Sequence, residues 1–322
     1  MLIKNLVLSG GQIKGLSYVG VLKAMEELEL TENIKNILGV SSGAIFAFGI
    51  ALGLTSTQLT KILDALTLDN LRDINSDNIL GFNETFGLDS CNQFCKIFKV
   101  ITKKLLGNEN ATFKDLKEKL PKYNLIIVGT NISKKTLDKF SYIDTPDMPI
   151  WLAVRISMSV PIYFTKVFYN GDCYVDGGIL NNYPITFFDN DIEHTLGIIL
   201  TDPDVEKEVN TIGAYMYKIM DCVMNVWQNY LKDKYSKNTI EIFVKYNLLE
   251  FRFDKEVKDL LIKQGYEEFK KIYSERFSDK EDKKSVSTNN ESIEDKNVED
   301  VIDFIREEIN SQGNIESIEN LL

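Results

Sequence analysis

The sequence contains a single histidine, His194, and only four cysteines among its 322 residues. Zinc sites and disulfide frameworks are built from clusters of these two residue types, so the composition argues against both. Cys91 and Cys95 stand four positions apart without a second pair, and Cys173 and Cys222 are isolated. We therefore expect free thiols in a reducing compartment, with no metal site and no cofactor.

The sequence also lacks a long hydrophobic run and a cluster of basic residues. Its longest mainly apolar stretch, residues 44–54, is too short to cross a bilayer. The N-terminal residues lead directly into a predicted strand, so we expect no signal peptide. Without clustered Lys and Arg, nucleic-acid binding is not expected. We expect a cytoplasmic protein whose membrane contact is peripheral and transient.

Acidic residues are concentrated near the C-terminus. The formal net charge is −11, and residues 278–322 contain 13 acidic but only 5 basic side chains. Residues 278–297 are charged and of low complexity, which is typical of a disordered segment. We therefore expect a globular domain at residues 1–277 and an acidic, largely disordered tail at 278–322 with a short helix at 298–309.

Strand and helix patterns alternate at the start of the chain. Apolar stretches at residues 5–8 and 35–40 end in Gly/Ser turns, and helical patterns follow at 16–28 and 42–52. This order predicts an α/β fold with a mainly parallel sheet. We expect a core that ends near residue 201 and a helical extension at 203–277. Further strands are predicted at 124–131, 136–142, 167–175, 195–200 and 240–246, and further helices at 55–66, 92–106, 112–120, 149–158, 212–230 and 255–273.

The first candidate site is the sequence Gly-Val-Ser-Ser-Gly at residues 39–43, which matches the G-x-S-x-G nucleophile elbow. It stands between a predicted strand and a predicted helix, as that elbow requires. A sharp turn there exposes the hydroxyl of Ser41, and Gly39 and Gly43 allow chain and ligand to approach closely. The helix N-terminus also favours negative charge beside Ser42. A plain tight turn is the alternative to a catalytic serine.

The second candidate is the glycine-rich turn at residues 9–15 (SGGQIKG). Backbone N–H groups in such a turn can stabilise an oxyanion or bind a phosphate. The glycines Gly10, Gly11 and Gly15 do not have the G-x-G-x-x-G spacing of dinucleotide-binding proteins. Lys14 either adds positive charge to the site or faces solvent. A purely structural turn stays open as an alternative.

The third candidate is Asp176, which is followed by Gly177 and Gly178 at the end of a predicted strand. Taken alone, Asp-Gly is as typical of a β-turn as of a catalytic carboxylate. The order of the motifs is more specific: a glycine turn, the serine elbow, R-x-S-x-S-x-P at residues 155–161, and then D-G-G. This order resembles the patatin-like phospholipase family over residues 5–201.

The resemblance implies a three-layer fold and hydrolysis of acyl esters in phospholipids or other lipids. It implies a catalytic dyad with Ser41 as nucleophile and Asp176 as base, and it calls for no cofactor or metal. Protein partners are not indicated. The oxyanion donors would be the N–H groups of Gly10, Gly11, Gln12 and Ser42. The family usually has a third glycine where this chain has Gln12, so a positive φ at this position would be strained and would lower activity or alter the substrate entrance.

The single histidine raises the alternative of a catalytic triad. Ser41, Asp176 and His194 follow the chain order of α/β-hydrolases. In that fold several strands precede the nucleophile, whereas here only one βα unit precedes the strand that carries Ser41. Residues 190–193 before His194 are polar, as in an exposed loop. We therefore expect a dyad. Two other hypotheses remain, a soluble esterase or thioesterase for small acyl esters, and a non-catalytic interaction protein with a degraded oxyanion loop.

Two segments are candidates for the substrate entrance, the helix at 42–54 and the polar loop at 69–90. A loop of this length inside a compact domain is often functional, for instance as a lid. The amphipathic stretch at 255–273 is expected to pack against the core rather than to contact a bilayer. Apolar side chains in the loop that could line an entrance are Ile79, Leu80, Phe82 and Phe86.

Overall fold

The computed structural model describes residues 2–311, except residue 75 and the segments 202–211, 246–252 and 278–294. The strands are β1 (Asn5–Leu8), β2 (Asn36–Gly39), β3 (Gly87–Asp89), β4 (Asn124–Asn131), β5 (Thr136–Ser141), β6 (Ile162–Phe164), β7 (Val167–Tyr169), β8 (Asp172–Asp176), β9 (Thr195–Thr201) and β10 (Thr239–Phe243). The α-helices are α1 (Ser17–Glu27), α2 (Ser42–Ala51), α3 (Ser56–Ala65), α4 (Leu68–Leu71), α5 (Ser76–Leu80), α6 (Phe82–Thr85), α7 (Asn92–Leu106), α8 (Phe113–Lys119), α9 (Ile150–Ser157), α10 (Gly178–Asn181), α11 (Ile212–Lys234), α12 (Lys255–Phe277) and α13 (Asp295–Ser311). Short 3₁₀ segments are η1 (Gln12–Leu16), η2 (Ile185–His194) and η3 (Ser236–Asn238).

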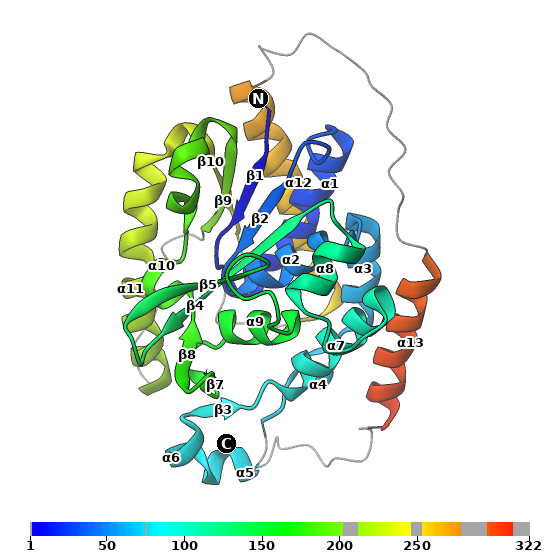
Figure 1. The fold of residues 1–322 in the computed structure, drawn as a ribbon, viewed down its shortest axis with the longest axis vertical. Coiled ribbons are helices and arrows are strands. Elements are labelled where there is room, and N and C mark those ends of the chain that lie inside the picture. Colours follow the sequence, from blue (N-terminus) through cyan, green and yellow to red (C-terminus); the bar gives the residue numbers. More distant parts are fainter. Residues whose placement is uncertain (1, 75, 202–211, 246–252, 278–294, 312–322) are drawn as a thin grey trace.

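The described residues form a central sheet in the order β10-β9-β1-β2-β4-β8-β7, with β5 paired to β4 outside this path (Figure 1). Strands β10, β9, β1, β2 and β4 are parallel, whereas β5, β7 and β8 are antiparallel to their neighbours. β1 lies inside the sheet, between β9 and β2, and is buried along its whole length, which explains the apolar run of Leu6, Val7 and Leu8. The mainly parallel α/β sheet is confirmed.

Alternate residues of β1 face two different cores. Leu6 and Leu8 belong to the larger core, which includes buried residues of α1, α2 and α12. Val7 faces the opposite side, where it joins a smaller core with Tyr183 and with Leu231 of α11. Because successive side chains of a strand point to opposite faces, the sheet is the middle layer of three. The three-layer architecture is thereby confirmed.

Most predicted elements are present with boundaries shifted by a few residues. The segment at 69–90 differs, because it contains α4, α5, α6 and β3 rather than an irregular loop. β3 pairs with β6 in a separate two-stranded sheet. These elements are three to five residues long, too short for a periodic pattern to reveal them.

α12, which the sequence predicts to pack against the core, lies tightly along α1. Gly20 and Gly265 bring the two backbones close together, since a Cβ on Gly20 would lie 1.9 Å from the carbonyl oxygen of Ile262. Leu261 and Phe269 of α12 are completely buried. The apolar face of this helix therefore belongs to the core and is not available to a bilayer.

The C-terminal helix α13 is docked on the body of the protein. Its apolar residues are buried against α3, α4 and α7, and its acidic residues face lysines, with Glu299 on Lys61 and Asp300 on Lys104, both at 3.0 Å. The sequence predicts a short helix here but gives no sign that it packs. The rest of the predicted tail, at 278–294 and 312–322, lies outside the described residues. The buried apolar residues of α13 are Val298, Val301, Ile302 and Ile305.

Candidate active site

Ser41 occupies a strained turn between β2 and α2. Its φ of 54° and ψ of −128° lie outside the regions that non-glycine residues usually adopt. The flanking glycines are required by close packing, because a Cβ on Gly43 would lie 2.4 Å from the carbonyl oxygen of Leu8, and one on Gly39 would lie 2.4 Å from that of Gly43. The predicted elbow thus has a steric cause for both of its glycines.

The Ser41 hydroxyl points at Asp176. Its Oγ donates a hydrogen bond of 2.6 Å to Asp176 Oδ2, while the backbone N–H of Gly178 donates to Oδ1 at 2.7 Å. The antiparallel pairing of β8 with β4 carries Asp176 to this position, beside Gly129. A Cβ on Gly177 would lie 2.6 Å from the carbonyl oxygen of Val128, so the chain can pass β4 closely only with glycine there.

The carboxyl group of Asp176 is fully buried. Loss of water raises its pKa to about 7, because burial disfavours the charged form, although the hydrogen bonds from Ser41 and Gly178 act in the opposite direction. A carboxylate with this pKa is a stronger base than an ordinary aspartate and is largely ionised only above neutral pH. The environment therefore supplies the basicity that a serine nucleophile needs.

The C-terminal end of α9 holds both halves of the pair. Ser157 Oγ accepts a hydrogen bond of 3.0 Å from the Ser41 N–H, and the Ser157 carbonyl accepts one of 3.4 Å from the Gly177 N–H. The carbonyl of Ser159 accepts a third, at 2.8 Å, from the N–H of Asp176. The two serines of R-x-S-x-S-x-P thus fix the positions of the elbow and the aspartate relative to each other.

Arg155 of the same motif is buried and acts as a structural clamp. Its guanidinium donates to the side chain of Ser159, to the carbonyl of Ser90 at 3.2 Å, and to the carbonyl and hydroxyl of Thr165 at 2.8 and 2.9 Å. It therefore ties α9 to the β3 and β6 segments. The motif is recognisable in the sequence by its resemblance to the family, but the roles of Arg155 and Ser157 are visible only in the fold.

The glycine turn before η1 packs beside the elbow. The N–H of Gly11 donates to Ser42 Oγ at 2.9 Å, and the N–H of Gly10 donates to the carbonyl of Asn182 at 3.2 Å. Two of the expected oxyanion donors thus have protein acceptors in this structure. Gly15 lets η1 approach the elbow, because a Cβ there would lie 2.8 Å from that of Ser42. Lys14, also in η1, is buried.

Gln12 has the left-handed backbone that glycine would favour. Its φ is 53°, and its side chain is exposed. For a residue with a Cβ this conformation costs about 1–2 kcal/mol. The difference from the usual glycine is therefore a real strain in the turn that carries the expected oxyanion donors. The N–H of Ser42 lies in the first turn of α2, where the helix itself supplies no acceptor.

Asn182 is a further residue of the site that sequence analysis missed. Its Nδ2 donates to the carbonyl of Gly10 at 3.3 Å and to Gln228 of α11 at 2.7 Å. Its buried Oδ1 has no hydrogen-bond partner among the described residues and lies between Gly10 and Gly178, where a Cβ on either glycine would be within 2.6 Å of it. It joins the glycine turn to α11. The pair Asn181-Asn182 after D-G-G was visible in the sequence, but nothing in its spacing indicated this contact.

His194 lies at the other end of the sheet. It ends η2, contacts Asp191 at 2.5 Å and Lys4 Nζ at 3.5 Å, and accepts from the Lys4 N–H through its carbonyl. Lys4 precedes β1, whereas the elbow follows the C-terminal end of the parallel strand β2. The structure thus separates His194 from Ser41 by the length of the sheet.

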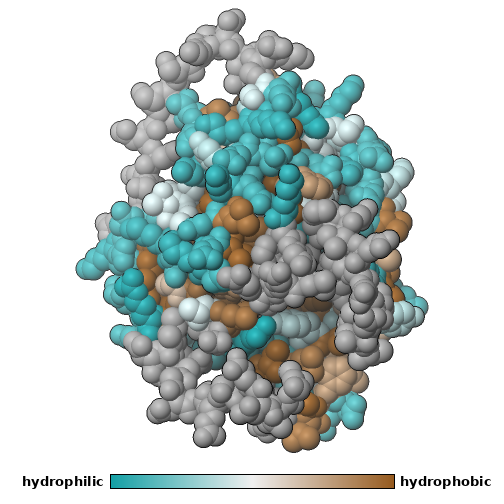
Figure 2. Space-filling view, turned by 180° about the vertical axis from the view of Figure 1, so that it is seen from behind, coloured by the Kyte–Doolittle hydropathy of each residue, from teal (hydrophilic) through white to brown (hydrophobic). Residues whose placement is uncertain are grey.

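The two predicted entrance segments differ in exposure. α2 is buried along nearly its whole length, so it cannot present a lid to solvent. The segment at 69–90 exposes Ile79, Leu80 and Phe86, and Phe82 is half-buried. Exposed hydrophobic residues gather at the lower end of the molecule in Figure 2, at the height where Figure 1 places α5, α6 and β3. This segment remains the candidate for an entrance.

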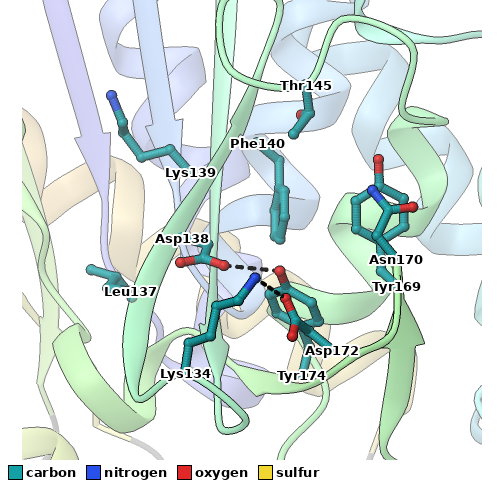
Figure 3. A pocket seen from close by; sticks show the side chains of 10 residues that line it. All are labelled: Lys134, Leu137, Asp138, Lys139, Phe140, Thr145, Tyr169, Asn170, Asp172 and Tyr174. Atoms are coloured by element: carbon teal, nitrogen blue, oxygen red, sulfur yellow. Dashed lines mark hydrogen bonds and ion pairs between the residues drawn. The ribbon is translucent and has the colours of Figure 1, made fainter.

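An open hollow elsewhere on the protein is lined by residues of β5, β7 and β8 and the turns beside them (Figure 3). Its polar groups are paired with one another: Lys134 contacts Asp172 at 2.5 Å, and Tyr174 donates to Asp138 at 2.8 Å. The Lys134 ammonium holds the pKa of Asp172 below its usual value. Asp172 begins the strand that Asp176 ends, about 13 Å along it, so this hollow is separate from the serine site.

Within the described ranges, His, Cys, Asp and Glu side chains form no group that could hold a metal ion. In the same part of the chain, no helix is both long and apolar enough to span a bilayer. All four cysteines are free thiols.

Comparisons with known proteins identify the family of this chain. The family model for patatin-like phospholipases matches residues 6–189. The chain is 31% identical over 280 residues to the uncharacterized protein R571 of Acanthamoeba polyphaga mimivirus, over 83% of this chain and 93% of that one. It is 34% identical over 184 residues to the probable lipid hydrolase 463L of Invertebrate iridescent virus 6, over 56% of this chain and 62% of that one.

A solved structure shares the fold. The crystal structure of VipD from Legionella pneumophila matches with a TM-score of 0.60 and 20% identity, over 86% of this chain and 67% of that one. The family match includes the glycine turn, the serine elbow and the aspartate block. These matches support lipid hydrolysis as the activity, and the chain belongs to the patatin-like phospholipase family.

Proposed function

We propose that this protein hydrolyses carboxylic esters of phospholipids or related lipids through a Ser41–Asp176 dyad. The observation that carries the proposal is the 2.6 Å hydrogen bond from the hydroxyl of Ser41, at the strained elbow, to a buried aspartate. Family membership supports the substrate class. The reaction needs a nucleophile, a base and donors for an oxyanion, and the site has a candidate for each.

The first step is acylation. Asp176 accepts the proton of the Ser41 hydroxyl as Oγ attacks the ester carbonyl, and a tetrahedral oxyanion forms. When this intermediate collapses, the bond to the leaving alcohol breaks, and the proton held by Asp176 passes to that alcohol. The raised pKa of Asp176 suits both transfers, because a group with a pKa near 7 can accept and then release a proton at neutral pH.

The second step is deacylation. Asp176 takes a proton from a water molecule, whose oxygen attacks the acyl-enzyme carbonyl. The fatty acid leaves, and Ser41 recovers its proton. The oxyanion of both steps would be held by the N–H of Ser42 at the start of α2 and by N–H groups of the glycine turn. For Gly10 and Gly11 to contribute, their N–H groups must leave the carbonyl of Asn182 and the hydroxyl of Ser42.

The proposal is tested with a fluorophosphonate probe, which reacts covalently with an activated serine. We expect labelling of the wild-type protein, with the adduct located on Ser41 by peptide mass spectrometry. Ser41→Ala should abolish labelling and Asp176→Asn should slow it strongly. Ser274→Ala, which changes an exposed serine on α12, is the matched control. Absence of labelling in the folded wild-type protein would instead favour a non-catalytic member of the fold.

A further inference from the structure

One face of α11 exposes an apolar stripe to solvent. Its six side chains recur three or four positions apart along the helix, so they lie on one side of it. None of the six is charged. A helix on the surface of a globular protein normally turns its polar face outward, and a contiguous exposed apolar patch marks an interaction site. The stripe consists of Tyr215, Ile219, Val223, Val226, Trp227 and Tyr230, each between 41% and 72% exposed.

The opposite face of the same helix reaches the serine site. Met224 lies against Gly178, since a Cβ on that glycine would be 2.4 Å from the Met224 methyl group. Gln228 is buried and bonded to Asn182, and Leu231 is buried in the smaller core. Gly178 is the residue whose N–H holds Asp176. One face of α11 therefore packs against residues next to the dyad and forms a wall of the serine site, while its other face carries the exposed stripe. Figure 1 shows α11 at the edge of the molecule beside α10.

We infer that this stripe is the surface by which the protein docks on a lipid bilayer, an inference that rests on the lipid hydrolysis proposed above. Trp and Tyr are enriched where proteins meet the membrane interface, and here Trp227 stacks on Tyr230 with ring centroids 5.0 Å apart. An in-plane helix of this kind buries its apolar face at the level of the lipid headgroups. Docking there would place the wall of the serine site next to its substrate.

Charge determines which kind of bilayer fits. The sequence carries a net charge of −11, and α11 itself has three lysines against two aspartates, so this helix is not strongly basic. Lys218 and Asp221 carry opposite charges in the middle of the helix, and Lys232 is paired with Glu241 at 3.1 Å. Anionic lipids would therefore gain little, and apolar burial must supply the binding. The expected surface is zwitterionic, and binding to it should be insensitive to salt.

A second copy of the chain fits the stripe less well. Stable protein interfaces use about 20–30 residues a side in a surface of matching shape. Six side chains along one helix are far fewer. A bilayer requires no matching contour, only apolar side chains at a common level.

The test measures docking apart from catalysis. In a Ser41→Ala, Trp151→Phe background, Trp227 is the remaining tryptophan of the two in the sequence. Adding phosphatidylcholine vesicles should shift its emission to the blue, equally at low and high salt. The double variant Val223→Asp, Val226→Asp should bind vesicles at least about tenfold more weakly in a flotation assay, because two charges would enter the interface. Ile143→Asp is the matched control, since Ile143 is 86% exposed outside α11.

The outcomes separate the two proposals. With Ser41 intact, the double variant should hydrolyse a short-chain soluble ester at the wild-type rate but lose activity on vesicles. If the protein binds vesicles but hydrolyses neither substrate, the docking surface is supported and the proposed function is contradicted. Equal vesicle binding by the double variant and Ile143→Asp overturns the docking surface. A wild-type dimer that the double variant converts to monomer in analytical ultracentrifugation overturns it as well, because the stripe would then be a subunit interface.

Discussion

Ser41 and Asp176 are 135 positions apart in the sequence, yet their side-chain oxygens lie 2.6 Å apart in a buried site. The protein's only histidine is at the opposite end of the sheet, bonded to Asp191. A carboxylate rather than an imidazole is therefore the partner of the serine, and the following predictions depend on this arrangement.

Replacing the base should separate a dyad from a triad. Asp176→Asn keeps the shape of the side chain but removes the proton acceptor, so we expect kcat/KM on a short-chain ester to fall about 10²–10⁴-fold. His194→Ala should leave kcat/KM close to the wild-type value. Steady-state rates of the two variants, compared at one pH, decide the matter. A large loss in His194→Ala would contradict the dyad.

Activity should rise with pH through neutrality. Because the pKa of Asp176 is raised to about 7 by burial, the base is protonated and inactive below that value. We expect kcat/KM to increase with pH along a single ionisation with its midpoint near 7. A profile flat between pH 5 and 8 would mean that another group of lower pKa is the base.

The same ionisation should act on stability in the opposite direction. The pKa of Asp176 is higher in the folded protein, about 7, than its ordinary value of 3.8. The folded state therefore holds this proton more tightly, and the resulting stabilisation is complete below about pH 4 and lost as the pH rises through 7. We expect urea unfolding to show Asp176→Asn gaining stability relative to wild type between pH 5 and 8. An unchanged difference across this range would argue against a raised pKa.

Gln12→Gly should relieve the strain in the glycine turn at residues 9–15. A glycine at φ 53° removes a cost of about 1–2 kcal/mol, partly offset by the greater freedom of glycine in the unfolded chain. We expect a gain of about 0.5–1 kcal/mol in the free energy of unfolding, with kcat equal to or above wild type. Gln12→Ala is the matched control, because alanine keeps the Cβ and hence the strain. If both variants behave alike, strain at this position has no effect.

The docking of α13 can be tested through Ile302, which is 3% exposed. Ile302→Ala should weaken the packing of α13 by about 2–5 kcal/mol. Amide hydrogen exchange, measured for individual peptides, should then be faster in α13 of the variant than in α13 of the wild type, while exchange in α9 stays the same. Lys296→Ala, on the exposed side of the same helix, should leave exchange nearly unchanged. Equal exchange in the two variants would mean that α13 is not packed in solution.

The local parts of this site were predictable from the sequence because local rules produce them. The elbow needs glycines at 39 and 43 because α2 starts against the end of β1. The G-x-S-x-G pattern at residues 39–43 therefore reveals the elbow in the sequence. β1 and β4 were recognisable because strands buried in a parallel sheet contain continuous apolar runs, here residues 6–8 and 125–128.

The contacts that assemble the site were not predictable in this way. Ser157 bonds to an N–H 116 positions away, and Asn182 bonds to Gly10 across 172 positions. Both contacts depend on the strand order and on the antiparallel direction of β8, which no local pattern encodes. The packing of α13 was missed for a related reason. Its apolar residues are spaced as in a helix, but the partner surface lies on α3 and α7, far away in the sequence.

The position of β1 also limits how this chain can fold during synthesis. Its neighbours are β2, about 31 residues later, and β9, about 190 residues later. On the ribosome, one edge of β1 must therefore wait unpaired until residue 201 has emerged, and α3 and α7 are covered by α13 only after a further hundred or so residues. Contacts this distant in sequence make folding slow. The growing chain thus leaves one edge of β1 unpaired for most of its translation, and an unpaired strand edge is a site where aggregation can begin.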